Sequence, residues 1–286
     1  MSRLLYYGLL IPFSLLPFRF LYWVSDLLYI LLYRVFSYRH EVVSSNLQMA
    51  FPEMTDSQRA RILEEFYRHI CDIIVEGIKS FTISNEELGR RYNFVNPEVL
   101  DSLYRERRDV IIAAGHYANW EWATMQSSRV FKHVCVGIYT PLTNKFLEQK
   151  MAESRSRTGL VLVPKDQVKE YFKKEHQEPQ LYYFLIDQSP SNANRAYWST
   201  FLGKETGIQY GAEKYSKEFN IPVFFLKVDR VKRGYYIQTL EEVVMEPTQQ
   251  VYGQILEKIY QKLESEILQQ PAWWLWSHRR WKHSKP

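Results

Sequence analysis

Three side chains able to move or orient protons occur close together in the stretch VIIAAGHYANWEWA, residues 110–123. An apolar, strand-like run ends at Gly115, and His116, Asn119 and Glu121 follow before a helical pattern begins. Ligands of open α/β sheets bind outside the carboxyl ends of the strands, so catalytic side chains are expected at this position. A carboxylate bound to one imidazole nitrogen leaves the other free to take a proton from a hydroxyl. We therefore predict that His116 is a general base and that Glu121 orients it.

The spacing places a condition on this pair. Five residues on a continuous helix turn through about 140°, so the two side chains meet only if His116 lies in a loop and Glu121 on the first helical turn. Asn119 and the backbone N–H groups at the helix start are then candidates for stabilising an oxyanion. The alternative is a loop histidine without a catalytic role and a first-turn carboxylate favoured by the helix dipole.

The pattern around this site predicts an α/β fold. Apolar runs typical of strands alternate with segments of helical spacing, which indicates a sheet flanked by helices. The strands are expected at 110–114, 134–139, 160–163, 181–186, 223–228 and 235–240, and the helices near 119–130, 144–157, 166–174, 209–219 and 248–268. The last two strands form a predicted hairpin, so the sheet is mixed and mostly parallel. A helix capped by Thr55 or Asp56 precedes them, and residues 39–52 are predicted to be a connector.

The N-terminal segment predicts contact with a membrane. Residues 4–18 are uncharged, but Arg19 interrupts the run and Pro12 and Pro17 would kink a helix. A single tilted spanning helix and a hairpin or amphipathic pair lying in one leaflet both fit. The third possibility is a buried core helix of a soluble protein. We predict a membrane-anchoring segment at 1–38 and a second domain at 39–286.

Composition excludes several classes of protein. A hydrophobic content of 46% and a charged content of 24% are those of a globular chain. The net charge of +5 is too weak to indicate nucleic-acid binding. Two cysteines, Cys71 and Cys135, make no disulfide framework, and neither lies in a metal-binding pattern. We therefore predict no metal, no bound cofactor and no nucleic-acid partner.

The C-terminal tail is aromatic and basic. It interleaves four tryptophans, Trp273, Trp274, Trp276 and Trp281, with His278, Arg279, Arg280 and Lys282. Such a cluster is typical of an anchor at a lipid head-group layer, and it can also stack nucleic-acid bases. The hydrophobic N-terminus favours lipid, while burial of some rings against the main domain is compatible with either interpretation.

The motif HYANWE resembles the HX4D/E motif of glycerolipid and lysophospholipid acyltransferases. The longer form GHxxNWE is similar to the branch that contains the lipid A secondary acyltransferases. Further segments resemble that branch in the same order: Arg39, 46–47 and 50–52 after the membrane segment, Asp187 and Gln188 after a strand, 201–204 with Gly203 and Lys204, and LWSHRRWK at 275–282.

The resemblance implies a glycerolipid acyltransferase-like fold and an O-acyltransferase. A lipid A precursor hydroxyl would attack an acyl thioester, carried by acyl carrier protein or coenzyme A, on the cytoplasmic side of a bacterial inner membrane. His116 would be the base and Glu121 its partner. Arg155, with Arg157 beside it, would face anionic head groups, although a solvated helix face explains both arginines equally well. Asp187 and Gln188 would order the substrate pocket; a simple strand-end turn is the alternative.

Two rival functions remain open. The acceptor can be another lipid, such as a lysophospholipid, an aminolipid or a glycolipid. A non-catalytic, lipid-binding membrane protein is the rival from another class, and the presence of both His116 and Glu121 disfavours it. Lysines at 165, 169, 173 and 174 could dock an acidic carrier protein or simply form a solvated helix face.

Overall fold

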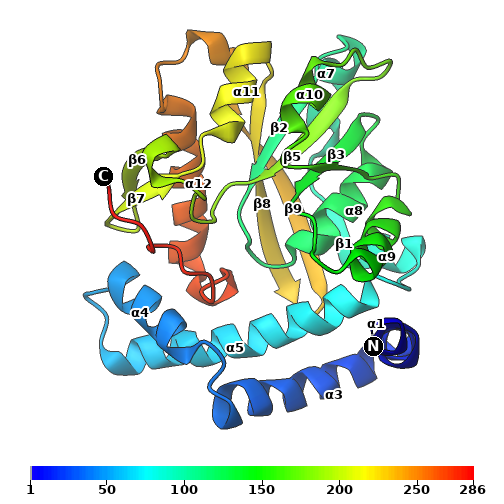
Figure 1. Ribbon diagram of the computed structural model, residues 1–286, viewed down its shortest axis with the longest axis vertical. Coiled ribbons are helices and arrows are strands. Elements are labelled where there is room, and N and C mark those ends of the chain that lie inside the picture. Colours follow the sequence, from blue (N-terminus) through cyan, green and yellow to red (C-terminus); the bar gives the residue numbers. More distant parts are fainter. Residues whose placement is uncertain (1) are drawn as a thin grey trace.

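A computed structural model describes residues 2–286 and has one large sheet with helices around it (Figure 1). The seven-stranded sheet has the order β1-β9-β8-β2-β5-β3-β4, and a separate two-stranded sheet pairs β6 with β7. The strands are β1 (Tyr92–Phe94), β2 (Val110–Ala114), β3 (Val134–Tyr139), β4 (Val161–Pro164), β5 (Gln180–Leu185), β6 (Tyr197–Phe201), β7 (Lys204–Ile208), β8 (Val223–Lys232) and β9 (Tyr235–Val244). Only the β8–β9 pair is antiparallel within the large sheet of the described chain, so the predicted mixed, mostly parallel sheet is confirmed.

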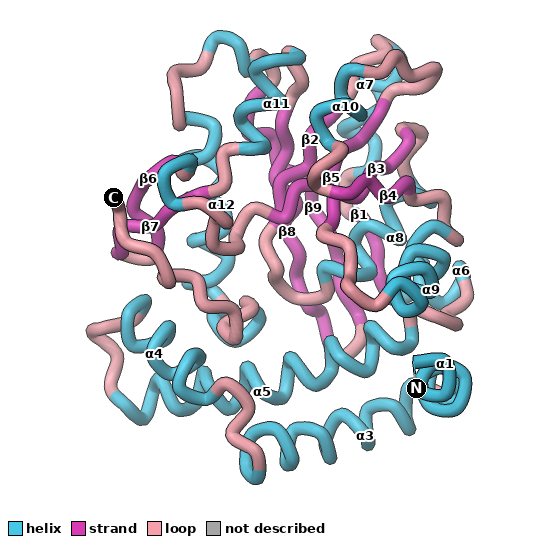
Figure 2. Tube along the Cα trace, in the orientation of Figure 1, coloured by secondary structure: helices cyan, strands magenta, loops and turns pink. Residues whose placement is uncertain are grey.

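Helices connect and flank these strands (Figure 2). They are α1 (Ser2–Leu5), α2 (Ile11–Leu15), α3 (Phe18–Tyr29), α4 (His40–Ala50), α5 (Asp56–Lys79), α6 (Asn85–Arg91), α7 (Asp101–Arg105), α8 (Trp120–Val130), α9 (Lys145–Ser156), α10 (Val168–Lys173), α11 (Gly211–Phe219) and α12 (Gln254–Gln269). Short π-helical turns cover Tyr6–Leu10 and Ile30–Val35. Every residue of β2 is buried, as expected for a central strand covered on both faces.

The predicted cap of α5 is confirmed. The Thr55 hydroxyl accepts from the backbone N–H of Gln58, and the Gln58 side chain accepts from the backbone N–H of Thr55. This capping box satisfies N–H groups that a helix start otherwise leaves unpaired. In Figure 1, α5 runs below the sheet and α3 lies alongside α5.

The structure corrects the sequence prediction for residues 39–52 and for the β6–β7 hairpin, and it adds β1, α6 and α7. Residues 39–52 are not a connector, because α4 occupies most of them and buries Val43, Asn46 and Leu47. The β6–β7 hairpin was missed because its strands are short and mostly polar. Its turn is formed by Leu202 and Gly203, both with positive φ, as a tight hairpin turn requires.

Candidate active site

The sheet order brings His116 and Asp187 together. His116 follows β2 and Asp187 follows β5, and these two strands are parallel neighbours. The His116 Nδ1 lies 2.6 Å from the Asp187 Oδ1, and the His116 backbone N–H donates to Oδ2 over 2.7 Å. The carboxyl ends of adjacent parallel strands meet at one edge of a sheet, so residues 71 positions apart in sequence become partners.

Asp187 is held as a carboxylate. Its side chain is 2% exposed, and burial by itself raises the pKa of a carboxyl. The neighbouring His116, the two bonds from His116 and a hydrogen bond of 2.7 Å from the Trp274 indole N–H together outweigh burial and lower the pKa of Asp187 overall. A charged Asp187 accepts the Nδ1 proton of His116 and leaves its Nε2 with a free lone pair.

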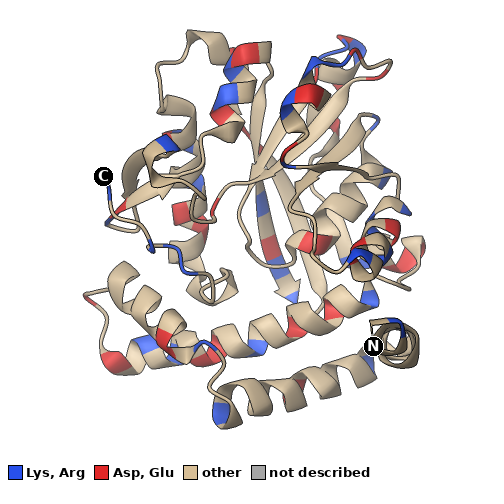
Figure 3. Ribbon diagram, viewed as in Figure 1, with Lys and Arg blue, Asp and Glu red and all other residues tan. Residues whose placement is uncertain are grey.

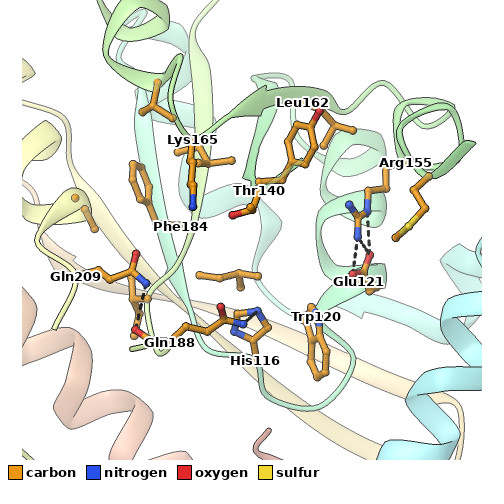
Figure 4. A pocket seen from close by; sticks show the side chains of 18 of the residues that line it. His116, Trp120, Glu121, Thr140, Arg155, Leu162, Lys165, Phe184, Gln188 and Gln209 are labelled. Atoms are coloured by element: carbon orange, nitrogen blue, oxygen red, sulfur yellow. Dashed lines mark hydrogen bonds and ion pairs between the residues drawn. The ribbon is translucent and has the colours of Figure 1, made fainter. Parts of the chain in front are cut away.

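The free nitrogen faces a pocket (Figure 4). The Gln188 side-chain nitrogen lies 3.2 Å from the His116 Nε2, a position suited to a donor, and Gln188 also lines the pocket. An acceptor hydroxyl that enters the pocket can take the place of the Gln188 amide at Nε2. This arrangement can perform general base catalysis on a bound hydroxyl.

Glu121 is paired with Arg155 and not with His116, which corrects the predicted pairing. Its carboxylate forms a bidentate pair with the Arg155 guanidinium, with distances of 2.8 and 2.9 Å from Nη2 and 3.1 Å from Nε. In Figure 4 this pair lies beyond Trp120 as seen from His116. His116 does lie in a loop and Glu121 on the first turn of α8, as expected. Asp187 takes the predicted partner's place because its strand adjoins that of His116.

Asn119 is also placed differently from the prediction. Its side chain is fully buried and caps α8, with Oδ1 accepting from the backbone N–H of Trp122 over 3.0 Å. Its Nδ2 donates to the Glu76 carboxylate over 2.6 Å. Both polar atoms are therefore bonded away from the pocket. Asn119 shapes the loop of residues 115–119 (the catalytic loop) rather than pointing a donor at the pocket.

The catalytic loop is held by the C-terminal tail. Tyr117 forms an antiparallel bridge with Trp274, the Ala118 N–H donates to the Trp273 carbonyl, and the Leu275 N–H donates to the His116 carbonyl. Ala118 has a φ of +50°, a conformation that costs energy for an alanine and needs such support.

Gly115 permits the close approach of α12 and Asp187. A β-carbon at this position would lie 2.6 Å from the Leu263 side chain and 3.5 Å from the Asp187 Oδ2. The first of these separations is shorter than van der Waals contact, so a larger residue would force the buried Leu263 side chain on α12 to shift. Glycine therefore allows the residue before His116 to pack closely against α12.

The pocket is lined by both charged and apolar side chains. Its volume is about 460 Å³, within the range of small-molecule sites. The polar lining includes His116, Gln188, Glu121, Arg155 and Lys165. Apolar and aromatic side chains also line the pocket, among them Ile138, Leu142, Met151, Leu162, Val168, Phe184 and Tyr215. Such a cavity can hold an alkyl chain with its reactive end beside a base.

The other predicted substrate-binding residues lie outside this pocket. Arg157 donates to the Ser80 carbonyl, while Gly203 and Lys204 belong to the β6–β7 hairpin. The pocket lining therefore keeps Arg155 and Gln188 from the predicted set, with Asp187 directly behind His116.

The tryptophan-rich tail is mostly folded into the domain. Trp276 is fully buried and Trp274 is 2% exposed, so neither ring can reach a lipid layer. The indole of Trp281 donates to the Thr206 hydroxyl. Sequence reasoning missed the contact of Trp274 with Asp187, because the two residues are far apart in the chain.

A sequence profile of the family described as "Bacterial lipid A biosynthesis acyltransferase" matches residues 2–283. The chain belongs to this family. It is therefore an acyltransferase, and the family implies an acyl donor and a lipid acceptor.

Two relatives of this acyltransferase show how far the similarity extends. A "Lipid A biosynthesis acyltransferase" of Haemophilus influenzae is 23% identical over 250 residues, which cover 85% of this chain and 78% of the relative. A "Lipid A biosynthesis palmitoleoyltransferase" of Escherichia coli K12 is 20% identical over 251 residues, covering 85% and 79%. The similarity therefore extends over most of both chains at low identity.

The N-terminal helices of the acyltransferase form a bent pair. Within residues 2–286, no single helix has both the length and the apolar character needed to cross a bilayer. Ser2–Leu15 and Phe18–Val35 meet these criteria only when taken together, and the chain bends by 119° between them.

Proposed function

We propose that the protein transfers a fatty acyl chain from a thioester to a hydroxyl of a lipid A precursor, with His116 as general base. The observation that carries this proposal is the position of His116 between a buried carboxylate, Asp187, and a pocket with an apolar wall. The names of the two relatives support lipid A as the acceptor class.

The chemistry follows from the protonation of this pair. The His116 Nε2 takes the proton of the acceptor hydroxyl while its oxygen attacks the thioester carbonyl carbon. Asp187 stabilises the imidazolium that forms. The tetrahedral intermediate then breaks its C–S bond, and the imidazolium returns the proton to the leaving thiolate. One ester bond forms, one thioester bond breaks, and the enzyme regains its initial state.

Two further groups have proposed roles at the reacting centre. The Gln188 amide is the polar donor nearest to Nε2, and it can turn toward the developing oxyanion once the hydroxyl has displaced it. Arg155, held in place by Glu121, presents a cation at the pocket wall, where it can bind an anionic part of the substrate. Glu121 thus becomes a positioning residue for Arg155 in this proposal.

The donor is proposed to be acyl carrier protein or coenzyme A, acting as a co-substrate. The acyl chain would occupy the apolar wall beside Phe184 and Leu162, while Lys165 at the pocket rim would meet the phosphate of the carrier.

The proposed location is the bacterial inner membrane, with the catalytic domain on its cytoplasmic side. Large apolar side chains are exposed along the N-terminal helices; examples are Leu4 (77%), Trp23 (60%) and Leu27 (55%). Burying such a face in the head-group and acyl boundary would anchor the protein without a spanning helix. Residues 1–38 would serve as the anchor and residues 39–286 as the acyltransferase domain.

The proposal is tested by acyl transfer from labelled acyl carrier protein to a lipid A precursor. We expect transfer by the wild type and a loss of about 10²-fold or more in His116→Ala. The matched control is His176→Ala, which changes a histidine that follows α10 and does not line the pocket. A folded wild type that acylates a lysophospholipid or an aminolipid instead would overturn the choice of acceptor, and a fully active His116→Ala would overturn the mechanism.

A further inference from the structure

A second cleft lies between the start of α4 and the C-terminal tail. It has a volume of about 750 Å³ and is lined by Ser37, Arg39, His40, Glu41, Val42, His278, Arg279 and Lys282. The two segments that form it are held together by specific bonds. Arg39 donates to the Ser277 carbonyl, and the buried Asn46 amide donates to the carbonyls of Trp276 and His278, each over 2.8 Å. The cleft is therefore a built feature of the fold, although its parts are some 230 residues apart in sequence.

The cleft is cationic. Arg39, Arg279 and Lys282 face one carboxylate, that of Glu41. Within residues 2–286, none of these three cations forms an ion pair with an acidic side chain. In Figure 3, basic residues appear both in the loop that enters α4 and along the tail. Guanidinium and ammonium groups gathered in a concave site are suited to a phosphate group.

Two neighbours of the cleft indicate where such a phosphate would come from. The preceding turn exposes Val35 (61%), Phe36 (69%) and Tyr38 (48%), which continue the apolar face of the N-terminal helices up to the cleft rim. A cleft at the edge of an apolar face lies at head-group depth when that face rests on a bilayer.

On its inner side the cleft is bonded to the segment that follows β5. The His278 Nε2 accepts from the Ser189 backbone N–H over 3.0 Å, and Gln188 next to Ser189 contacts His116. A lipid held in the cleft would therefore lie beside the catalytic pocket.

We propose that this cleft binds the phosphate of a membrane lipid head group, and that Arg279 and Lys282 provide the main contacts. The binding adds a specific head-group contact to the proposed apolar anchor. It rests on that membrane contact but does not depend on acyl transfer.

The test measures binding of the full-length protein to phosphatidylcholine vesicles that contain either phosphatidic acid or oleate, matched in surface potential. We expect the wild type to prefer phosphatidic acid, and Arg279→Ala/Lys282→Ala to lose about tenfold or more of its affinity for those vesicles. The matched control is Arg105→Ala/Lys132→Ala, which removes the same two charges near α7, at the opposite end of the molecule from α3 in Figure 1.

Each outcome decides a separate point. Equal losses of affinity in the two double variants would contradict phosphate binding in the cleft. The absence of a preference for phosphatidic acid over oleate would contradict it as well. A further outcome is that inorganic phosphate or coenzyme A protects the arginines of the wild-type cleft from chemical modification. If such protection occurred without any preference for phosphatidic acid, the cleft would be a site for a soluble ligand, and the assignment to a membrane lipid would be wrong. Binding of all variants to phosphatidylcholine alone tests the apolar anchor independently, and acyl transfer plays no part in the readout.

Discussion

Two carboxylates compete for the role of orienting His116, and burial distinguishes them. Asp187 is 2% exposed and contacts both the imidazole and the backbone of His116. The Glu121 side chain is 30% exposed and is neutralised by Arg155. A buried, charged acceptor fixes the Nδ1 tautomer much more strongly than a carboxylate already engaged by a guanidinium.

Asp187→Asn should lower kcat by about 10²- to 10⁴-fold with little change in KM. The amide keeps the shape of the side chain but removes the charge that stabilises the imidazolium, and it can favour the wrong tautomer. Steady-state kinetics with labelled thioester measures this, and the thermal midpoint controls for folding. A variant with wild-type kcat would show that Asp187 does not act through His116.

Glu121→Gln should instead raise KM more than it lowers kcat. The substitution removes the charge that holds the Arg155 guanidinium at the pocket wall, and ground-state binding then weakens. The same kinetic assay separates the two effects. A fall in kcat as large as that of Asp187→Asn, at unchanged KM, would return Glu121 to the role of orienting His116.

At the scale of elements, α5 connects the N-terminal helices to the catalytic loop. The buried Glu76 carboxylate accepts from the Tyr22 hydroxyl on α3, from Tyr236 on β9 and from Asn119 at the start of α8. Burial, assisted by the charge of Asp72 and opposed by these hydrogen bonds, raises the pKa of Glu76 to about 7.

This shift makes stability fall as pH rises. The folded state holds a proton on Glu76 that the unfolded state, with a pKa of 4.5, loses earlier. The stabilisation from this proton is complete below the unfolded pKa of 4.5 and is lost as pH rises through about 7. The loss lowers the free energy of unfolding by an amount on the order of 3 kcal/mol. Denaturant unfolding between about pH 5 and pH 8 should show a shallower slope for Glu76→Gln than for the wild type. Glu266, whose pKa is raised to about 8 by burial, contributes the same sign and remains in both proteins. Equal slopes would contradict the assignment.

The two faces of α3 should respond differently to substitution. Leu21 is fully buried against the domain, whereas Leu27 is 55% exposed on the proposed membrane face. Leu21→Ala should lower the free energy of unfolding by about 2 to 5 kcal/mol. Leu27→Glu should leave unfolding nearly unchanged and weaken flotation with phosphatidylcholine vesicles. A Leu27→Glu variant that floats like the wild type would argue against this face as the anchor.

At the scale of the whole molecule, distant parts of the chain converge on one carboxylate. Asp187 receives hydrogen bonds from His116 and from Trp274, so the C-terminal tail completes the site. Trp274→Phe keeps an aromatic ring in the core but removes the indole N–H. We expect kcat to fall about tenfold with a small change in thermal midpoint, the size of one hydrogen bond to a charged group. Unchanged kcat would limit the tail to a structural role.

Much of the architecture follows from local pattern. The β2 and β3 boundaries, the β8–β9 hairpin and the capping box of α5 are determined by apolar runs, turn residues and the Thr55–Gln58 pair. The position of His116 after a central strand follows in the same way. These features depend on residues that are neighbours in the chain, and local physical chemistry is readable from their order.

The partners within the site depend on strand order instead. Residue spacing favoured Glu121 as the partner of His116, but the placement of β5 beside β2 delivered Asp187, and the return of the tail delivered Trp274. The same packing took Asn119 out of the pocket and buried Trp274 and Trp276, two rings of a tail whose composition is typical of a membrane anchor. The sequence by itself thus determined most of the elements and the position of the proposed base, His116. The tertiary structure decided which carboxylate serves that base, because hydrogen-bond partners are selected by distance in space and not by separation along the chain.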